Sequence, residues 1–199
     1  MTPDAGTPTL AAMIDHRLMR PWTARPLTPG ERALCMETFG GDLHLDRVRL
    51  WSCPPLAWTT GRPFCAGGWL WPGRSLVVYP PRDAHADFAG ASLWEQSLFI
   101  HEMTHVWQSQ RGVNLLWAKI RAGDGPAAYA YDLTPDCIWD GFNIEQQAML
   151  VQHAFLQRRG RAAPHPEAAY LAVLPFTPSS GPGAAASSQA LAGPSASPT

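Results

Sequence analysis

Two histidines and a glutamate stand at fixed spacing in the middle of a strongly apolar segment. The segment reads His101-Glu102-Met103-Thr104-His105. In a helix of about 3.6 residues per turn, side chains four positions apart lie on one face, so both imidazoles can reach one zinc ion. Glu102 projects about 100° further around the helix, where it can meet a metal-bound water without becoming a ligand. The spacing therefore predicts a zinc site with Glu102 as the general base.

The surroundings of this motif are typical of a buried helix. Ser92, followed three residues later by Glu95, forms a capping box, and Gly112 supplies a stop. Because polar groups are costly to bury without partners, two histidines and a glutamate on such a helix favour a metal site over ordinary core histidines. The apolar residues of the segment are Leu93, Trp94, Leu98, Phe99, Ile100, Met103, Val106 and Trp107.

A catalytic zinc takes three protein ligands, so a third must come from outside this helix. The extended metzincin pattern HExxHxxGxxH is not met, because Gln108 and Arg111 stand where it requires Gly and His. Downstream, Asn143 is a candidate N-cap of a second helix that runs to Arg159. Glu145 lies in the first turn of that helix, and we predict it as the third ligand.

Other acidic residues compete with Glu145 for this role. Asp136 and Asp140, in the preceding loop, could supply a carboxylate instead. His153 falls about 80° around the helix from Glu145 and is expected to face elsewhere. Glu145 itself could simply complement the helix macrodipole. The remaining histidines have no partner at ligand spacing and are expected on the surface: His16, His44, His85 and His165.

The remaining elements predict an α+β domain. Residues 28–31, Thr-Pro-Gly-Glu, form a capping box for a helix that ends near Phe39, and residues 47–51 alternate as a strand. Segments 68–71 and 75–79 flank a Pro-Gly pair and indicate a hairpin, whose second strand could receive an extended peptide. We expect a minimal zincin-like fold: a small antiparallel sheet packed against the HExxH helix and a second, ligand-bearing helix.

We place the zincin-like domain at residues 28–160, with a long loop between its two ligand-bearing helices. Residues 1–27 are expected to be a partly disordered N-terminal extension with a short helix near 11–19. Residues 161–199 are rich in Pro, Ala, Ser and Gly and are expected to be a largely disordered tail.

Charge and hydropathy exclude several classes of partner. A formal net charge of −1 leaves no electrostatic footprint for nucleic acid, and no apolar run is long enough for membrane insertion. The N-terminus lacks a leader pattern, so we expect a cytoplasmic protein, or one exported without a cleavable signal. The four cysteines form no CxxC pair, and Cys53 and Cys65 are expected to be reduced.

Two motifs together carry a resemblance to a known family. HEMTHVWQ at 101–108, followed by NIEQQA at 143–148, resembles the gluzincin-like HExxH metallopeptidases among proteobacterial Vgr-related proteins. Their relatives include the zincin-like domain associated with contractile injection systems. The similarity covers about residues 27–159, including LTPGERAL at its start.

This resemblance implies a zinc-dependent metallopeptidase, with His101, His105 and Glu145 as ligands and Glu102 as base. It would act on a peptide or protein substrate and be a component of type VI secretion or a related machine. Peptide hydrolysis also needs a group that stabilises the oxyanion, for which Tyr129 or Tyr131 could supply a phenol. The alternative is a non-catalytic, zinc-stabilised assembly or accessory domain of such a secretion system.

Overall fold

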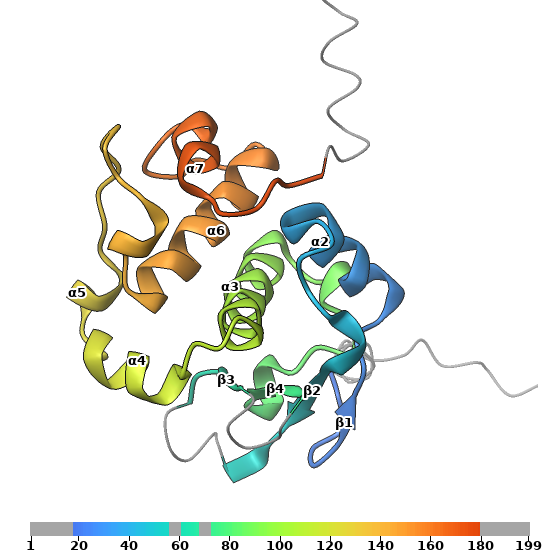
Figure 1. Ribbon diagram of the computed structural model, residues 1–199. Coiled ribbons are helices and arrows are strands. Elements are labelled where there is room, and N and C mark those ends of the chain that lie inside the picture. Colours follow the sequence, from blue (N-terminus) through green and yellow to red (C-terminus); the bar gives the residue numbers. More distant parts are fainter. Residues whose placement is uncertain (1–17, 56–60, 68–72, 180–199) are drawn as a thin grey trace, which may run out of the picture.

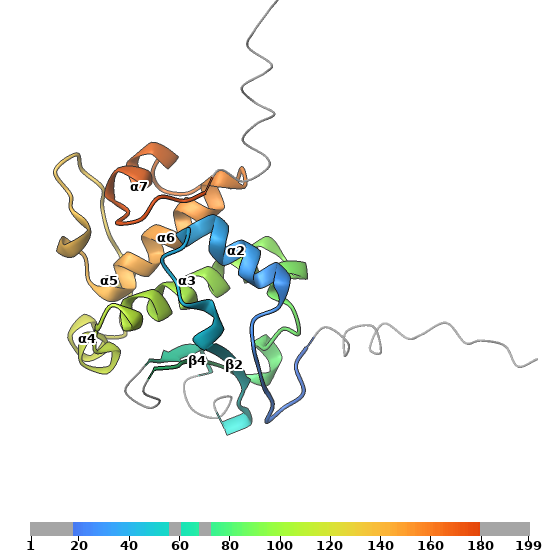
Figure 2. The ribbon, with the colours of Figure 1, turned by 45° about the vertical axis from the view of Figure 1, so that its right-hand side comes forward.

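The computed structural model describes residues 18–55, 61–67 and 73–179. Within them the fold is α+β, as predicted, and the helices and a small four-stranded sheet form separate layers (Figure 1). Helix α3 (Leu93–Gln110) lies between the sheet and helix α6 (Ile144–Arg158), as Figures 1 and 2 show. The HExxH segment therefore runs through the middle of the molecule.

The sheet is mixed, so the prediction of a wholly antiparallel sheet was wrong. Its order is β1-β2-β4-β3, with antiparallel pairs at both sides and a parallel pair, β2 with β4, in the centre. β4 is buried at four of its five positions, which is typical of a strand covered on both faces. The strands are β1 (Ala24–Arg25), β2 (Val48–Ser52), β3 (Phe64–Ala66) and β4 (Ser75–Tyr79).

The antiparallel partner of β4 is β3, in which Cys65 lies opposite Val77. The predicted partner segment 68–71 lies outside the described residues. Because β4 has a strand on each side, its backbone groups are already paired. It therefore cannot accept a peptide by strand addition, which the sequence had left open. The outer strands of the described sheet are β1 and β3.

Three predicted helices are present, and side-chain caps define where each begins. The side chains of Thr28, Ser92 and Asn143 each accept a hydrogen bond from the backbone of the third helical residue. The side chain of that residue in turn accepts one from the backbone N–H of the cap. Such reciprocal pairs satisfy two of the donors that a helix start leaves free. The helices that follow are α2 (Pro29–Phe39), α3 and α6.

A fully buried carboxylate ties α2 to the segments around it. Glu31 accepts hydrogen bonds from the Arg25 guanidinium at 2.6 and 2.7 Å and from the backbone of Thr28 and Phe88. A buried charge is tolerated when it is paired and its remaining lone pairs are bonded. Glu31 therefore joins β1, α2 and the chain that leads into α3.

The packed part of the chain extends beyond the predicted limits 28–160 on both sides. Met19 and Leu27 are buried before it, and Tyr170, Val173 and Phe176 are buried after it. Tyr170 and Val173 lie on a short helix and Phe176 follows it, a pattern too brief to stand out in a Pro- and Ala-rich segment. Residues 1–17 and 180–199, which include most of the predicted N-terminal helix, lie outside the described residues.

The segment between α3 and α6 contains two further helices, whereas we expected a long loop. Asn114 caps its first helix, and Gly123 ends it at a positive φ of 76°. None of the residues of that helix is buried, so no apolar stripe marks it in the sequence. The additional helices are α4 (Leu115–Ala122), α5 (Pro126–Tyr129) and α7 (Glu167–Val173), with short 3-10 turns at Leu45–Arg47, Pro81–Asp83, Phe88–Gly90 and Trp139–Gly141. No helix among the described residues has the length and apolar character needed to cross a bilayer.

Candidate metal centre

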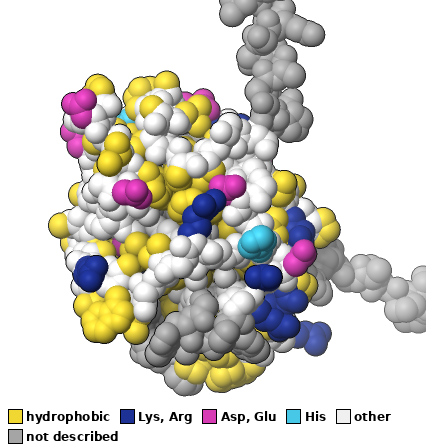
Figure 3. All heavy atoms as spheres, in the orientation of Figure 1, with side chains coloured by type: hydrophobic (Ala, Val, Ile, Leu, Met, Phe, Trp, Pro, Cys, Tyr) yellow, Lys and Arg dark blue, Asp and Glu magenta, His cyan; other side chains and the backbone are white. Residues whose placement is uncertain are grey.

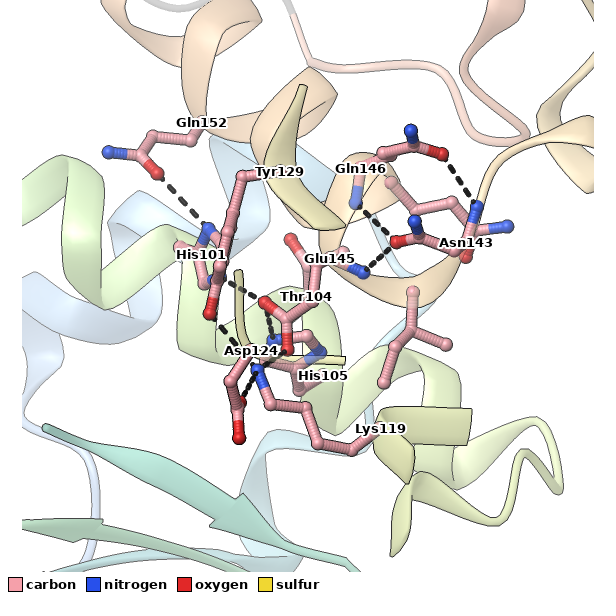
Figure 4. Close-up of polar contacts among 12 residues, drawn as sticks. His101, Thr104, His105, Lys119, Asp124, Tyr129, Asn143, Glu145, Gln146 and Gln152 are labelled. Carbon is pink, nitrogen blue, oxygen red and sulfur yellow. Dashed lines mark hydrogen bonds and ion pairs between the residues drawn. The ribbon is translucent and has the colours of Figure 1, made fainter. Parts of the chain in front are cut away.

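Helices α3 and α6 bring three buried ligand groups to one point. His101 and His105 project from successive turns of α3, and Glu145 projects from the first turn of α6 (Figure 4). Glu145 Oε2 lies 3.4 Å from His101 Nε2 and 3.5 Å from His105 Nε2. The three ligand atoms all lie within 4.8 Å of one another. In the described part of the chain this is the one such cluster of His, Cys, Asp and Glu, and it includes neither Asp136 nor Asp140.

The spacing of these atoms suits zinc. Two ligand atoms that each bind a tetrahedral zinc at about 2.0–2.1 Å lie about 3.4 Å apart. The two distances from Glu145 Oε2 to the histidine nitrogens, 3.4 and 3.5 Å, match that separation. Two imidazoles and one carboxylate are also a donor set of catalytic zinc sites, in which a fourth position stays open. The residues present therefore fit the ion that the sequence predicts.

The far side of the first histidine is held by a glutamine of α6. His101 Nδ1 lies 3.1 Å from Gln152 Oε1, and Gln152 Nε2 donates to Ser97 Oγ. Ser97 Oγ in turn donates to the Trp94 carbonyl, so it accepts from the glutamine amide. This series of hydrogen bonds turns Gln152 Oε1 toward the His101 ring. In the neutral imidazole the proton then sits on Nδ1, and the Nε2 lone pair is free for a metal.

A second glutamine holds the other histidine in the same way. His105 Nδ1 lies 2.8 Å from Gln108 Oε1, and Gln108 Nε2 donates to the Ile144 carbonyl and to Gln147 Oε1. Because these two acceptors fix the amide, Gln108 Oε1 must accept from the ring. Gln108 stands where the metzincin pattern has glycine, and the structure gives it this orienting role. The sequence offered no signal for it, since a buried glutamine three residues from a histidine is not a motif.

Glu102 is buried beside the cluster and has an unused hydrogen-bonding atom. Its Oε2 has no hydrogen-bond partner among the described residues. Burial raises the pKa of the Glu102 carboxyl, and the neighbouring His105 and His101 imidazoles offset only part of the rise. A buried carboxylate oxygen without a partner can form the missing hydrogen bond with a water molecule or a substrate group. A raised pKa suits a general base, which takes up a proton and later returns it.

A lysine that we did not predict contacts the third ligand. Lys119 Nζ, from α4, lies 2.7 Å from Glu145 Oε1 (Figure 4). Burial alone would raise the pKa of the Glu145 carboxyl, but its contacts with His101, His105 and Lys119 lower it well below the usual range. Glu145 is therefore a carboxylate, the form that binds metal. Tyr129, one of the two candidate phenols, also lies here, because its hydroxyl is 3.0 Å from Lys119 Nζ.

Tyr131, the other candidate phenol, belongs to a separate cluster. Its hydroxyl contacts His153 Nδ1 and lies 3.2 Å from the Tyr170 hydroxyl. The His165 ring completes the group, with its centroid 5.9 Å from that of Tyr131. His153 thus faces away from the metal ligands, as its helical position predicted, and Tyr131 is not placed to assist at the metal centre.

His153 is expected to make the fold weaker in mild acid. Burial lowers the pKa of its imidazole, and electrostatic repulsion from the His101 and His165 imidazoles lowers it further. The unfolded chain therefore binds this proton first as the pH falls through the usual histidine range near about 6.5, which lowers the free energy of unfolding. Urea unfolding should show a smaller difference in the free energy of unfolding between pH 7.5 and pH 5.5 for His153→Gln than for the wild type. An equal pH-dependent difference in the two proteins would contradict the assignment of this acid sensitivity to His153.

Comparison with known proteins gives a match in sequence and a match in structure. No protein-family model matches it. It is 36% identical, over 143 residues, to the type VI secretion system spike protein VgrG2b of Pseudomonas aeruginosa. The match takes in 67% of this chain but only 13% of the length of that curated relative.

A solved structure resembles the fold as well as the sequence. It is the effector domain of Pseudomonas aeruginosa VgrG2b, with a TM-score of 0.59 and 32% sequence identity. The alignment covers 75% of this chain and 80% of that domain. The expected resemblance to Vgr-related proteins of type VI secretion is thus confirmed, and the chain belongs to the family of the VgrG2b effector domain.

Proposed function

We propose that this chain is a zinc-dependent peptide hydrolase that acts as an effector domain of a type VI secretion system. The observation that carries the proposal is the buried Glu102 carboxylate, with one oxygen unpaired, beside three converging ligand atoms. A zinc that only stabilises a fold needs no such base next to it. The link to secretion is supported by the relative, which is named as a spike protein of that system.

The chemistry divides between the metal and the side chains around it. Zinc, when held by His101, His105 and Glu145, would polarise a peptide carbonyl and lower the pKa of a water molecule. Glu102 would accept the proton of the attacking water and pass it to the leaving amine nitrogen. Tyr129, which reaches the site through Lys119, is the phenol that could donate to the developing oxyanion.

A second candidate function is a zinc-stabilised accessory domain without catalysis. It is favoured by the position of the ligands, because His101 and His105 lie on α3 and Glu145 lies on α6. A metal there would join two helices whose packing forms much of the interior, and binding would add to folding stability. Glu102 is not a metal ligand in either function. Only the catalytic function requires it, as the general base.

Metal removal from the purified chain tests the proposal. We expect about one zinc per chain by elemental analysis, as a site with three protein ligands requires. Hydrolysis of unfolded, fluorescently labelled casein should stop with 1,10-phenanthroline and return with added zinc. The non-chelating isomer 1,7-phenanthroline is the control. Bound zinc with no hydrolysis of casein or of a peptide library would favour the accessory function, and no zinc in a folded chain would overturn both.

A further inference from the structure

The two oxygens of the Glu145 carboxylate have different neighbours. Oε2 faces the two histidine nitrogens at 3.4 and 3.5 Å, and Oε1 lies 2.7 Å from Lys119 Nζ. A carboxylate can bind a metal through one oxygen or through both. A cation bonded to one oxygen leaves only the other for the metal. Lys119 is therefore placed to determine whether Glu145 binds a metal through one oxygen or through both.

The ammonium of Lys119 is held from every side on which it can donate. It is 2.7 Å from Glu145 Oε1, 3.0 Å from the Tyr129 hydroxyl and 3.1 Å from Asp124 Oδ1 (Figure 4). Three acceptors match the three donors of an ammonium group. A surface lysine that merely balances charge usually samples many rotamers. Lys119 instead has a defined position, fixed by Asp124 and Tyr129 from the segment that follows α4 and by Glu145 from α6.

Helix α4 turns several large apolar side chains away from the core, whereas Leu115 at its start packs against the core. Leu116, Trp117 and Ile120 are exposed, and Figure 3 shows hydrophobic surface where α4 lies in Figure 1. On its inner side, α4 meets α6 across an open hollow lined in part by Ala118 and Phe142. Beside this hollow, the contact from Lys119 to Glu145 connects the two helices directly.

We propose that Lys119 is a positioning residue: by bonding Oε1, it makes Glu145 a ligand through Oε2 alone and so sets the metal site. The inference rests on the proposed zinc site and adds the reason that its third ligand presents one oxygen. A single-oxygen ligand leaves a coordination position open for substrate or water, as catalytic zinc sites require. Residues that orient a ligand in this way typically change metal affinity by about 10–100-fold when they are replaced.

The test is metal binding by Lys119→Met, in which the side chain keeps much of its length but loses its charge. Arg121→Met is the matched control, because it removes a cation from the same helix without touching Glu145. Competition with a fluorescent chelator should show zinc affinity at least about 10-fold weaker in Lys119→Met and unchanged in Arg121→Met. Tyr129→Phe, which keeps the ring and loses one acceptor of the ammonium, should weaken zinc binding in the same direction by less.

Cobalt reports the coordination directly. The wild type loaded with Co²⁺ should show the strong visible absorption of a four-coordinate ion. The spectrum of Lys119→Met should weaken toward that of a five-coordinate ion, as Glu145 turns to bind through both oxygens. An unchanged spectrum and zinc affinity within twofold of the wild type, in both Lys119→Met and Tyr129→Phe, would overturn the inference and leave the proposed function standing. A wild type that binds neither metal would overturn both.

Discussion

Glu102→Gln is expected to reduce kcat/KM for peptide hydrolysis by about 10²–10⁴-fold, the usual contribution of a general base. The amide has nearly the shape of the carboxylate but cannot accept a proton at neutral pH. Because Glu102 is not a ligand in the cluster, zinc content should stay at the wild-type value. Stability should not fall either, since burial already disfavours the charged form of this side chain.

The matched control for this variant lies on the same helix. Glu95→Gln makes the same chemical change at the partly exposed N-terminal end of α3, where the carboxylate caps the helix. It should cost some stability and leave hydrolysis intact. Initial rates on one peptide substrate, with zinc per chain and the midpoint of thermal unfolding measured on each preparation, separate the two effects. Full hydrolysis by Glu102→Gln would remove the general base from the mechanism.

The same variant separates the two functions in a secretion assay. An effector that acts by hydrolysis should lose its effect on a target cell when Glu102 is replaced, although it is still produced and folded. An accessory domain should keep its contribution to secretion, because that function uses only the folded, metal-bound chain. Catalysis and assembly thus predict opposite results from one substitution.

The sequence predicted those parts of the site that are local in the chain. The pair His101 and His105 is visible because helical periodicity alone places both on one face. Glu145 could be predicted because a cap at Asn143 puts it in the first turn of a helix. The residues that orient these ligands have no such signal. Gln152 meets His101 across 51 positions, and Lys119 meets Glu145 across 26, so both contacts exist only after the helices pack.

The errors in the predicted fold have a similar origin. A Pro-Gly pair before β4 indicates a hairpin, and β4 does pair antiparallel with the preceding strand β3. Its other partner, β2, is parallel, and that pairing depends on how the intervening chain crosses. Helix α4 was taken for a loop because it buries no apolar stripe. Lys119 of this same helix contacts the third ligand, so the element that sequence periodicity could not reveal is one that touches the metal centre.

The second large effect is expected at the ligands themselves. His105→Ala and Glu145→Ala should each lower zinc from about one ion per chain to near zero once loosely bound ions are removed, because two ligands hold zinc far more weakly than three. His153→Ala is the matched control, since it removes a histidine that faces the Tyr131 cluster and not the metal ligands. Elemental analysis on the three variants and the wild type measures this directly.

Loss of zinc should also appear as loss of metal-dependent stability. Free zinc at about 100 times its Kd should raise the free energy of unfolding of the wild type by about 2.7 kcal/mol. His105→Ala and Glu145→Ala should show almost none of this gain, and His153→Ala should show all of it. Glu145→Ala should be the less stable of the two ligand variants without metal, because it leaves Lys119 beside a cavity without its nearest carboxylate. A Glu145→Ala chain stabilised by zinc as strongly as the wild type would mean that the third ligand lies elsewhere, and Asp136 or Asp140 would then be the next residues to replace.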